Sequence, residues 1–74
     1  MIKIANTDVI FAVLTMNGAT IANMCLVGVN NLADVMRQLR KQVPSVAGLA
    51  RLIVRNTTQG WARSHNIALS PLLG

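Results

Sequence analysis

Residues 9–27 read VIFAVLTMNGATIANMCLV, and this segment gives the strongest structural signal in the sequence. At its centre stands Asn17-Gly18, between apolar runs over residues 9–16 and 19–27. Asn-Gly supplies the two positive φ angles that a type I′ turn needs, and the twist of that turn matches the strands on either side. The stretch therefore predicts a β-hairpin.

The predicted hairpin has no polar face. With Met16 opposite Ala19, one face carries Ile10, Ala12, Leu14, Met16, Ile21, Asn23, Cys25 and Val27. The other carries Val9, Phe11, Val13, Thr15, Thr20, Ala22, Met24 and Leu26. A hairpin with one wet side alternates apolar and polar residues. We therefore expect both sides of this hairpin to be covered.

The same segment has an alternative interpretation as a transmembrane helix. Residues 9–33 carry no formal charge, and a run of that length can span a bilayer. Asn17, Gly18 and Asn23 inside the run, together with its β-branched residues, favour the hairpin. Asp8 directly before the run also makes a poor secretory signal, with Lys3 as the one positive residue ahead of it.

After this hairpin the apolar period changes from 2 to about 3.6, which predicts a helix. Asn30 and Asn31 come first, and either side chain can cap a helix. The apolar residues that share one stripe are Leu32, Val35, Met36, Leu39 and Val43. The opposite side takes Asp34, Arg37, Gln38 and Lys41, with Arg40 at the margin. Pro44 disfavours helical geometry at Val43, so we expect the helix to end there or just before.

The last third of the chain predicts a second hairpin. Residues 49–55 and 61–69 are the strands, and the polar segment 56–60 is the turn. Its register stays open, because a slip of one residue exchanges the faces of its side chains. Ser70-Pro71 ends the last strand, and the apolar tail Leu72-Leu73-Gly74 carries no structural signal.

Together these elements predict one α+β domain over residues 1–74, in the order ββαββ. A helix between the second and third strands most simply gives an antiparallel sheet in the order 2-1-3-4, with the amphipathic helix across one face. One helix leaves the second apolar face of the first hairpin open, and such faces normally mark interfaces. We expect a homo-oligomer, with a twofold dimer favoured.

Composition indicates the kind of partner. The chain is 53% hydrophobic and 12% charged, and its formal net charge is +5. An anionic macromolecule such as nucleic acid suits this charge, although the charge also serves solubility alone. Cys25 is the one cysteine, so no internal disulfide forms, and a reducing cytoplasm fits best.

Groups for catalysis are few. They comprise Asp8, Asp34, His65 and Cys25. We expect Asp34 to favour the positive start of the helix, Cys25 to be buried and inert, and His65 to be a solvated surface residue. No metal-ligand cluster and no phosphate-binding glycine spacing is present in the sequence, so we expect no metal, no cofactor and no enzyme. A small enzyme using His65 or Cys25 remains the weaker hypothesis.

The remaining signal is cationic. The tentative nucleic-acid or anion-binding residues are Arg37, Arg40, Lys41, Arg55, Arg63 and Trp61. Guanidinium groups bind phosphates and an exposed indole stacks on a base. Each of these residues also has a structural interpretation. Cations complement the C-terminal end of a helix and discourage further pairing at a sheet edge, and a Trp often closes the edge of a small core. The leading expectation is a non-enzymatic homo-oligomeric module that binds nucleic acid or another anionic macromolecule, and the alternative is a structural or protein-interaction subunit.

Overall fold

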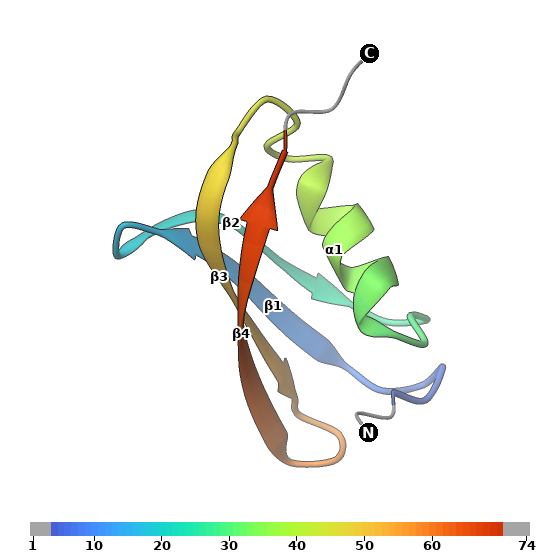
Figure 1. The fold of residues 1–74 in the computed structure, drawn as a ribbon. Helices are drawn as coiled ribbons and strands as arrows, with labels where there is room; N and C mark the ends of the chain where they lie inside the picture. The colour runs from blue at the N-terminus through green and yellow to red at the C-terminus, as the bar shows by residue number, and fades with distance from the viewer. Residues whose placement is uncertain (1–3, 71–74) are drawn as a thin grey trace.

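The computed structural model describes residues 4–70, which form four strands and one helix in the order ββαββ. The sheet is antiparallel with strand order β2-β1-β3-β4, and the helix lies against one of its faces (Figure 1). The predicted fold class and strand order are confirmed. We call the face that the helix covers the inner face of the sheet, and the opposite one the outer face.

The first hairpin consists of β1, Ile10–Met16, and β2, Ala19–Leu26. Met16 pairs with Ala19 across the turn, as predicted. Asn17 has a φ of 54° and Gly18 a φ of 79°, the two positive values that a type I′ turn needs. The local sequence signal and the backbone therefore agree at this turn.

The predicted faces of β2 were wrong beyond the turn. The register shifts between Leu14 and Thr15, because Thr15 pairs with Thr20 whereas Leu14 pairs with Ala22. Ile21 is the extra residue of a β-bulge, which moves every later side chain of β2 to the other face. Residues 22, 24 and 26 thus join the inner face, while Asn23 and Cys25 lie on the outer face.

This bulge changes the character of the hairpin. Its inner face is apolar throughout, but its outer face mixes Phe11 and Val13 with Thr15, Asn23 and Cys25. The expectation that both sides are apolar therefore fails for the outer side. Cys25, expected to be buried, is exposed for the same reason.

Helix α1 spans Leu32–Arg40 and ends before Pro44, as expected. Asn31 is the cap, because its side-chain oxygen accepts a hydrogen bond from the Asp34 backbone N–H at 2.9 Å. Val35 and Leu39 are completely buried against the β1–β2 half of the sheet. The helix therefore fixes which face of the sheet becomes the core.

The second hairpin consists of β3, Gly48–Asn56, and β4, Trp61–Leu69. Leu52 pairs with His65 and Val54 with Arg63, so those two side chains of β4 lie on the inner face. The outer face receives Ala62, Ser64 and Asn66. These pairs settle the register that the sequence left open.

A buried carboxylate ties the segment before β1 to the β3–β4 turn. Asp8 accepts hydrogen bonds from the Ala5 backbone N–H at 3.0 Å, from the Asn56 side chain at 2.8 Å and from the Gln59 side chain. The Ala5 and Asn56 donors favour the charged form more than burial disfavours it, and they hold the pKa of Asp8 below its ordinary value. Asn56 also accepts from the Gln59 backbone N–H, which shapes the turn.

Among residues 4–70, no helix has the length and apolar character needed to cross a membrane. The strand β4 ends at Leu69, one residue before Ser70. Pro71 and the tail Leu72-Leu73-Gly74 lie outside the described residues, as does Lys3.

Candidate functional site

The six cationic and aromatic residues singled out from the sequence fall in three separate places. Arg37, Arg40 and Lys41 belong to α1 or its end. Arg55 lies on the outer face of β3. Trp61 and Arg63 lie on the inner side of β4. The fold therefore does not gather them into one surface.

Two of the helix cations are already engaged within the chain. Arg37 donates to the Asp34 carboxylate at 2.8 Å in an exposed ion pair. Arg40 is only 9% exposed and donates to the backbone carbonyl of Ser70, so it holds the end of β4 against the helix. Lys41 remains exposed. Arg40 therefore has a structural role that its place in the sequence did not indicate.

Trp61 and Arg63 interact with each other. The Arg63 guanidinium carbon lies 5.9 Å from the centre of the Trp61 ring, within the range of a cation–π contact. The Trp61 indole N–H donates to the Gln59 side chain at 3.3 Å, and the ring packs against the core. Arg63 also donates to the Ala62 carbonyl at 3.0 Å. The indole N–H and the aromatic ring of Trp61 thus both have partners within the described chain.

The outer face of the sheet forms a different constellation. Its side chains fall in rows across the strands, and the first row reads Cys25, Phe11, Arg55 and Ala62. The second row reads Asn23, Val13, Ile53 and Ser64. The third reads Thr20, Thr15, Arg51 and Asn66. Along β3, Arg55 and Arg51 therefore lie in the rows on either side of the apolar pair Val13 and Ile53.

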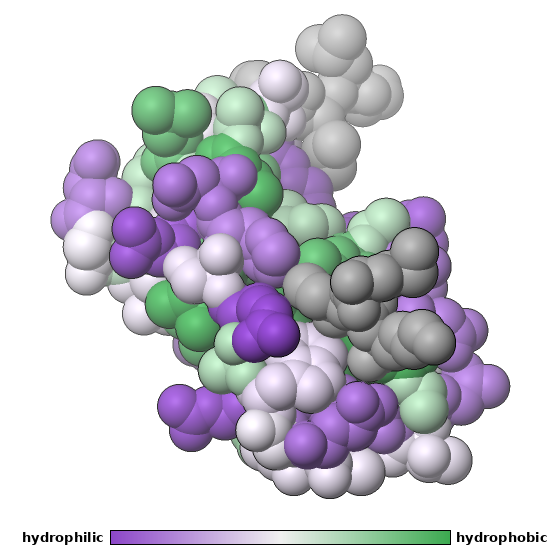
Figure 2. All heavy atoms as spheres, turned by 60° about the horizontal axis from the view of Figure 1, so that its bottom comes forward, coloured by the Kyte–Doolittle hydropathy of each residue, from purple (hydrophilic) through white to green (hydrophobic). Residues whose placement is uncertain are grey.

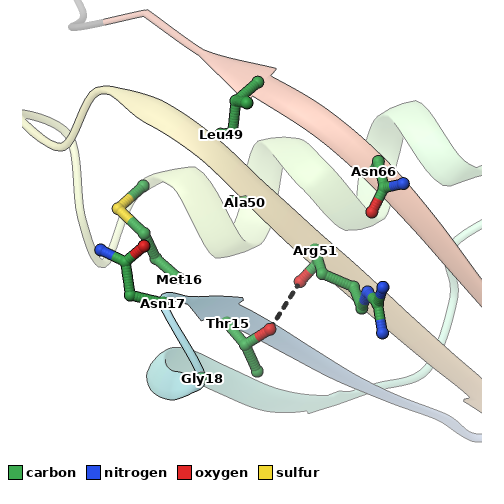
Figure 3. Close-up of a pocket in the computed structure, with 8 residues that line it drawn as sticks. All are labelled: Thr15, Met16, Asn17, Gly18, Leu49, Ala50, Arg51 and Asn66. Atoms are coloured by element: carbon green, nitrogen blue, oxygen red, sulfur yellow. Dashed lines mark hydrogen bonds between the residues drawn. The ribbon is translucent and has the colours of Figure 1, made fainter.

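This outer face carries two hollows. One, of about 380 Å³, is lined by Phe11, Val13, Ile53, Arg55 and Thr57. The other, of about 510 Å³, lies by the β1–β2 turn, where Arg51 and Asn66 are neighbours on β3 and β4 and α1 lies behind the strands (Figure 3). Thr15 donates to the Arg51 carbonyl at 3.5 Å there. Phe11 is 47% exposed and Ile53 37% exposed, so a ligand can reach both.

The charge on the outer face is not balanced by any acidic side chain among residues 4–70. The protein has two acidic side chains; Asp8 is buried under Asn56 and Gln59, and Asp34 binds Arg37. Within residues 4–70, neither Arg51 nor Arg55 has an ion-pair partner. With Arg51, Arg55, Phe11 and Ile53 exposed, the outer face is positive, partly apolar and open. At the end of the molecule that carries the β3–β4 turn, hydrophilic side chains are interspersed with hydrophobic ones (Figure 2).

The candidate groups for catalysis lie far apart in the sheet. Cys25 is on the outer face of β2, whereas His65 is on the inner face of β4, and these are the two edge strands. They cannot act as a pair. His65 is half-buried rather than solvated, and its Nε2 has no hydrogen-bond partner in the described part of the chain. Residues 4–70 contain no group of three or more metal-ligating side chains.

The binding residues predicted from the sequence did not include Phe11, Arg51 or Ile53. For Arg51 and Ile53 the signal is the alternation along β3, in which Arg51, Ile53 and Arg55 are exposed between buried neighbours. That pattern marks a strand with one solvated side. Placing Phe11 beside Arg55 also needs the pairing of β1 with β3, which no local motif encodes.

Comparisons of this chain with protein-family models, with curated proteins and with solved structures found no match.

Proposed function

We propose that this chain is a non-enzymatic module that binds nucleic acid through the outer face of its sheet. The observation that carries the proposal is that Arg51 and Arg55 are exposed on the outer face, Arg55 beside Phe11, with no counter-charge in the described chain. Free guanidinium groups bind phosphates, and phosphate contacts provide most of the affinity of such proteins. The net charge of +5 adds long-range attraction.

The proposal predicts binding that weakens as salt rises. A fluorescein-labelled oligonucleotide, titrated with protein and followed by anisotropy, should lose affinity steeply between about 50 and 200 mM salt, because counterions compete for the phosphates. In Arg51→Ala/Arg55→Ala, the slope of log affinity against log salt should fall by about 0.7–0.9 for each lost phosphate contact. Absence of binding at low salt would reject the proposal.

The matched comparison is Arg37→Ala/Lys41→Ala on α1. It removes two positive charges, as the outer-face variant does, so the long-range attraction falls equally in both variants. Arg37 is already neutralised by Asp34, and the helix lies on the other side of the sheet (Figure 1). The helix variant should therefore weaken binding less than the outer-face variant. A larger loss in the helix variant would move the contact surface to α1.

A second candidate function is a structural or protein-interaction subunit that binds a different protein through exposed apolar side chains of its outer face. It is favoured by the exposure of Phe11, Ile53 and Leu49 on the outer face, the last of which is 81% exposed. Contiguous exposed apolar groups commonly mark such interfaces. Purification at low salt that yields a stoichiometric protein partner and no nucleic acid would select this function.

The lone, exposed Cys25 also leads us to propose a reducing cytoplasm as the compartment.

A further inference from the structure

Phe11 occupies a position that phosphate binding alone does not explain. It lies on β1, a central strand of the sheet, directly between Cys25 on β2 and Arg55 on β3. Apart from Arg55, the other side chains of its row, Cys25 and Ala62, are small. About half of the residue is exposed, and its ring forms one wall of the hollow that Val13, Ile53 and Thr57 complete. A flat apolar group fits against such a ring.

We infer that the outer face binds single-stranded nucleic acid, with Phe11 stacking on an unpaired base beside Arg55, and with Arg55 and Arg51 holding phosphates along β3. This inference rests on the proposed nucleic-acid function and names its ligand. Stacking on an aromatic ring tolerates every base, because every base has a π face. A single aromatic ring beside an arginine therefore suits binding with little sequence preference.

The dimensions of the sheet favour a single strand over a duplex. Three strand spacings of about 4.8 Å make the backbone of this four-stranded sheet roughly 14 Å wide, and side chains add to that. A major groove is about 12 Å wide and admits a helix or a two-stranded ribbon. This sheet cannot enter it. A duplex would touch the outer face with its phosphates alone, and Phe11 would meet no base.

The arginines also decide between a nucleic acid and a second copy of the chain. Two outer faces stacked on each other would bring together Arg51 and Arg55 of both copies. Neither face holds a carboxylate, because both acidic side chains are engaged elsewhere in the chain. Like charges brought together in this way oppose association, whereas a phosphate backbone neutralises them. Charge complementarity therefore favours the anionic occupant.

Along β3 the two arginines are four residues apart, which corresponds to roughly 13 Å. The apolar pair Val13 and Ile53 lies between them. A nucleic-acid strand running along β3 would thus place phosphates near the two arginines. Its bases would lie over Phe11 at the Arg55 end and over Val13 and Ile53. The small residues of β4 on this face, Ala62, Ser64 and Asn66, leave that path open.

The test compares three probes of equal length, about 12 nucleotides, which is within the usual site size of a single-strand-binding fold. They are oligo-dT, an abasic strand with the same phosphates, and a duplex. Each is titrated at low salt with the unaltered protein, with Phe11→Leu and with Phe11→Tyr. Leu keeps an apolar side chain on the surface without the ring, and Tyr keeps the ring. Circular dichroism of each variant establishes that the fold is kept.

We expect oligo-dT to bind more tightly than the abasic strand or the duplex. Phe11→Leu should weaken oligo-dT binding roughly tenfold, the scale of one stacked base, and leave abasic binding unchanged. Phe11→Tyr, which keeps an aromatic ring, should bind oligo-dT about as tightly as the unaltered protein does. Equal binding of duplex and oligo-dT, or an unchanged oligo-dT affinity in Phe11→Leu, would overturn the inference and leave the proposed function standing. Failure of all three probes to bind would reject both.

Discussion

Asp8 shows how one buried residue orders distant parts of the chain. Its carboxylate accepts from Ala5, Asn56 and Gln59, and the neighbouring Val9 N–H donates to the Thr58 hydroxyl at 2.9 Å. The β3–β4 turn is therefore anchored to the segment before β1. A charged acceptor forms stronger hydrogen bonds than a neutral one, so the negative charge of Asp8 matters to this anchor.

The pH dependence of stability should report that charge. Because the folded pKa of Asp8 is lowered, its contribution is present above the ordinary carboxyl pKa and is lost as pH falls through the folded value. Urea unfolding of the unaltered chain should therefore show a steeper loss of stability below about pH 4 than Asp8→Asn shows. The Asn variant should be less stable at pH 7. Parallel pH profiles for the two proteins would contradict this assignment.

The N-cap of α1 makes a contribution to stability that can be measured directly. The sequence offered Asn30 and Asn31, and the structure assigns the cap to Asn31, whose side chain binds the Asp34 N–H. Asn31→Ala should lower the free energy of unfolding by about 1 kcal/mol. Asn30→Ala is the matched control and should change it by less than about 0.5 kcal/mol, as exposed substitutions usually do. Equal losses in the two variants would contradict the assignment.

Element order and turn type were predictable because each depends on local chemistry, and strand order followed from the simplest crossover that a helix between the second and third strands allows. Asn17-Gly18 specifies its turn, and the stripe that includes Val35 and Leu39 specifies the helix. The bulge at Ile21 was not predictable, since either register of β2 offers apolar residues to the core. The predicted binding residues do not share one surface for a related reason, because residues near in sequence, such as Arg55 and Arg63, lie on opposite faces of the sheet.

Both edges of the four-stranded sheet are partly protected from pairing with another strand. In β2 the Asn23 carbonyl accepts from the Gln42 side chain at 3.0 Å, and in β4 the Ala62 carbonyl accepts from Arg63. Side chains bound to edge carbonyls hinder the addition of another strand. The outer face is therefore the more accessible surface for a second copy, and it is also the surface proposed for nucleic acid.

These two uses of one face should respond to salt in opposite directions. Self-association brings Arg51 and Arg55 of two copies together, so screening should strengthen it, while nucleic-acid binding weakens. Light scattering should show the mass rising from 7.9 kDa towards twice that value as salt increases. Arg51→Ala/Arg55→Ala should dimerise more tightly than the unaltered chain at low salt, although it binds nucleic acid less. A dimer that dissociates as salt rises, or that is lost in this variant, would mean that the arginines hold the copies together.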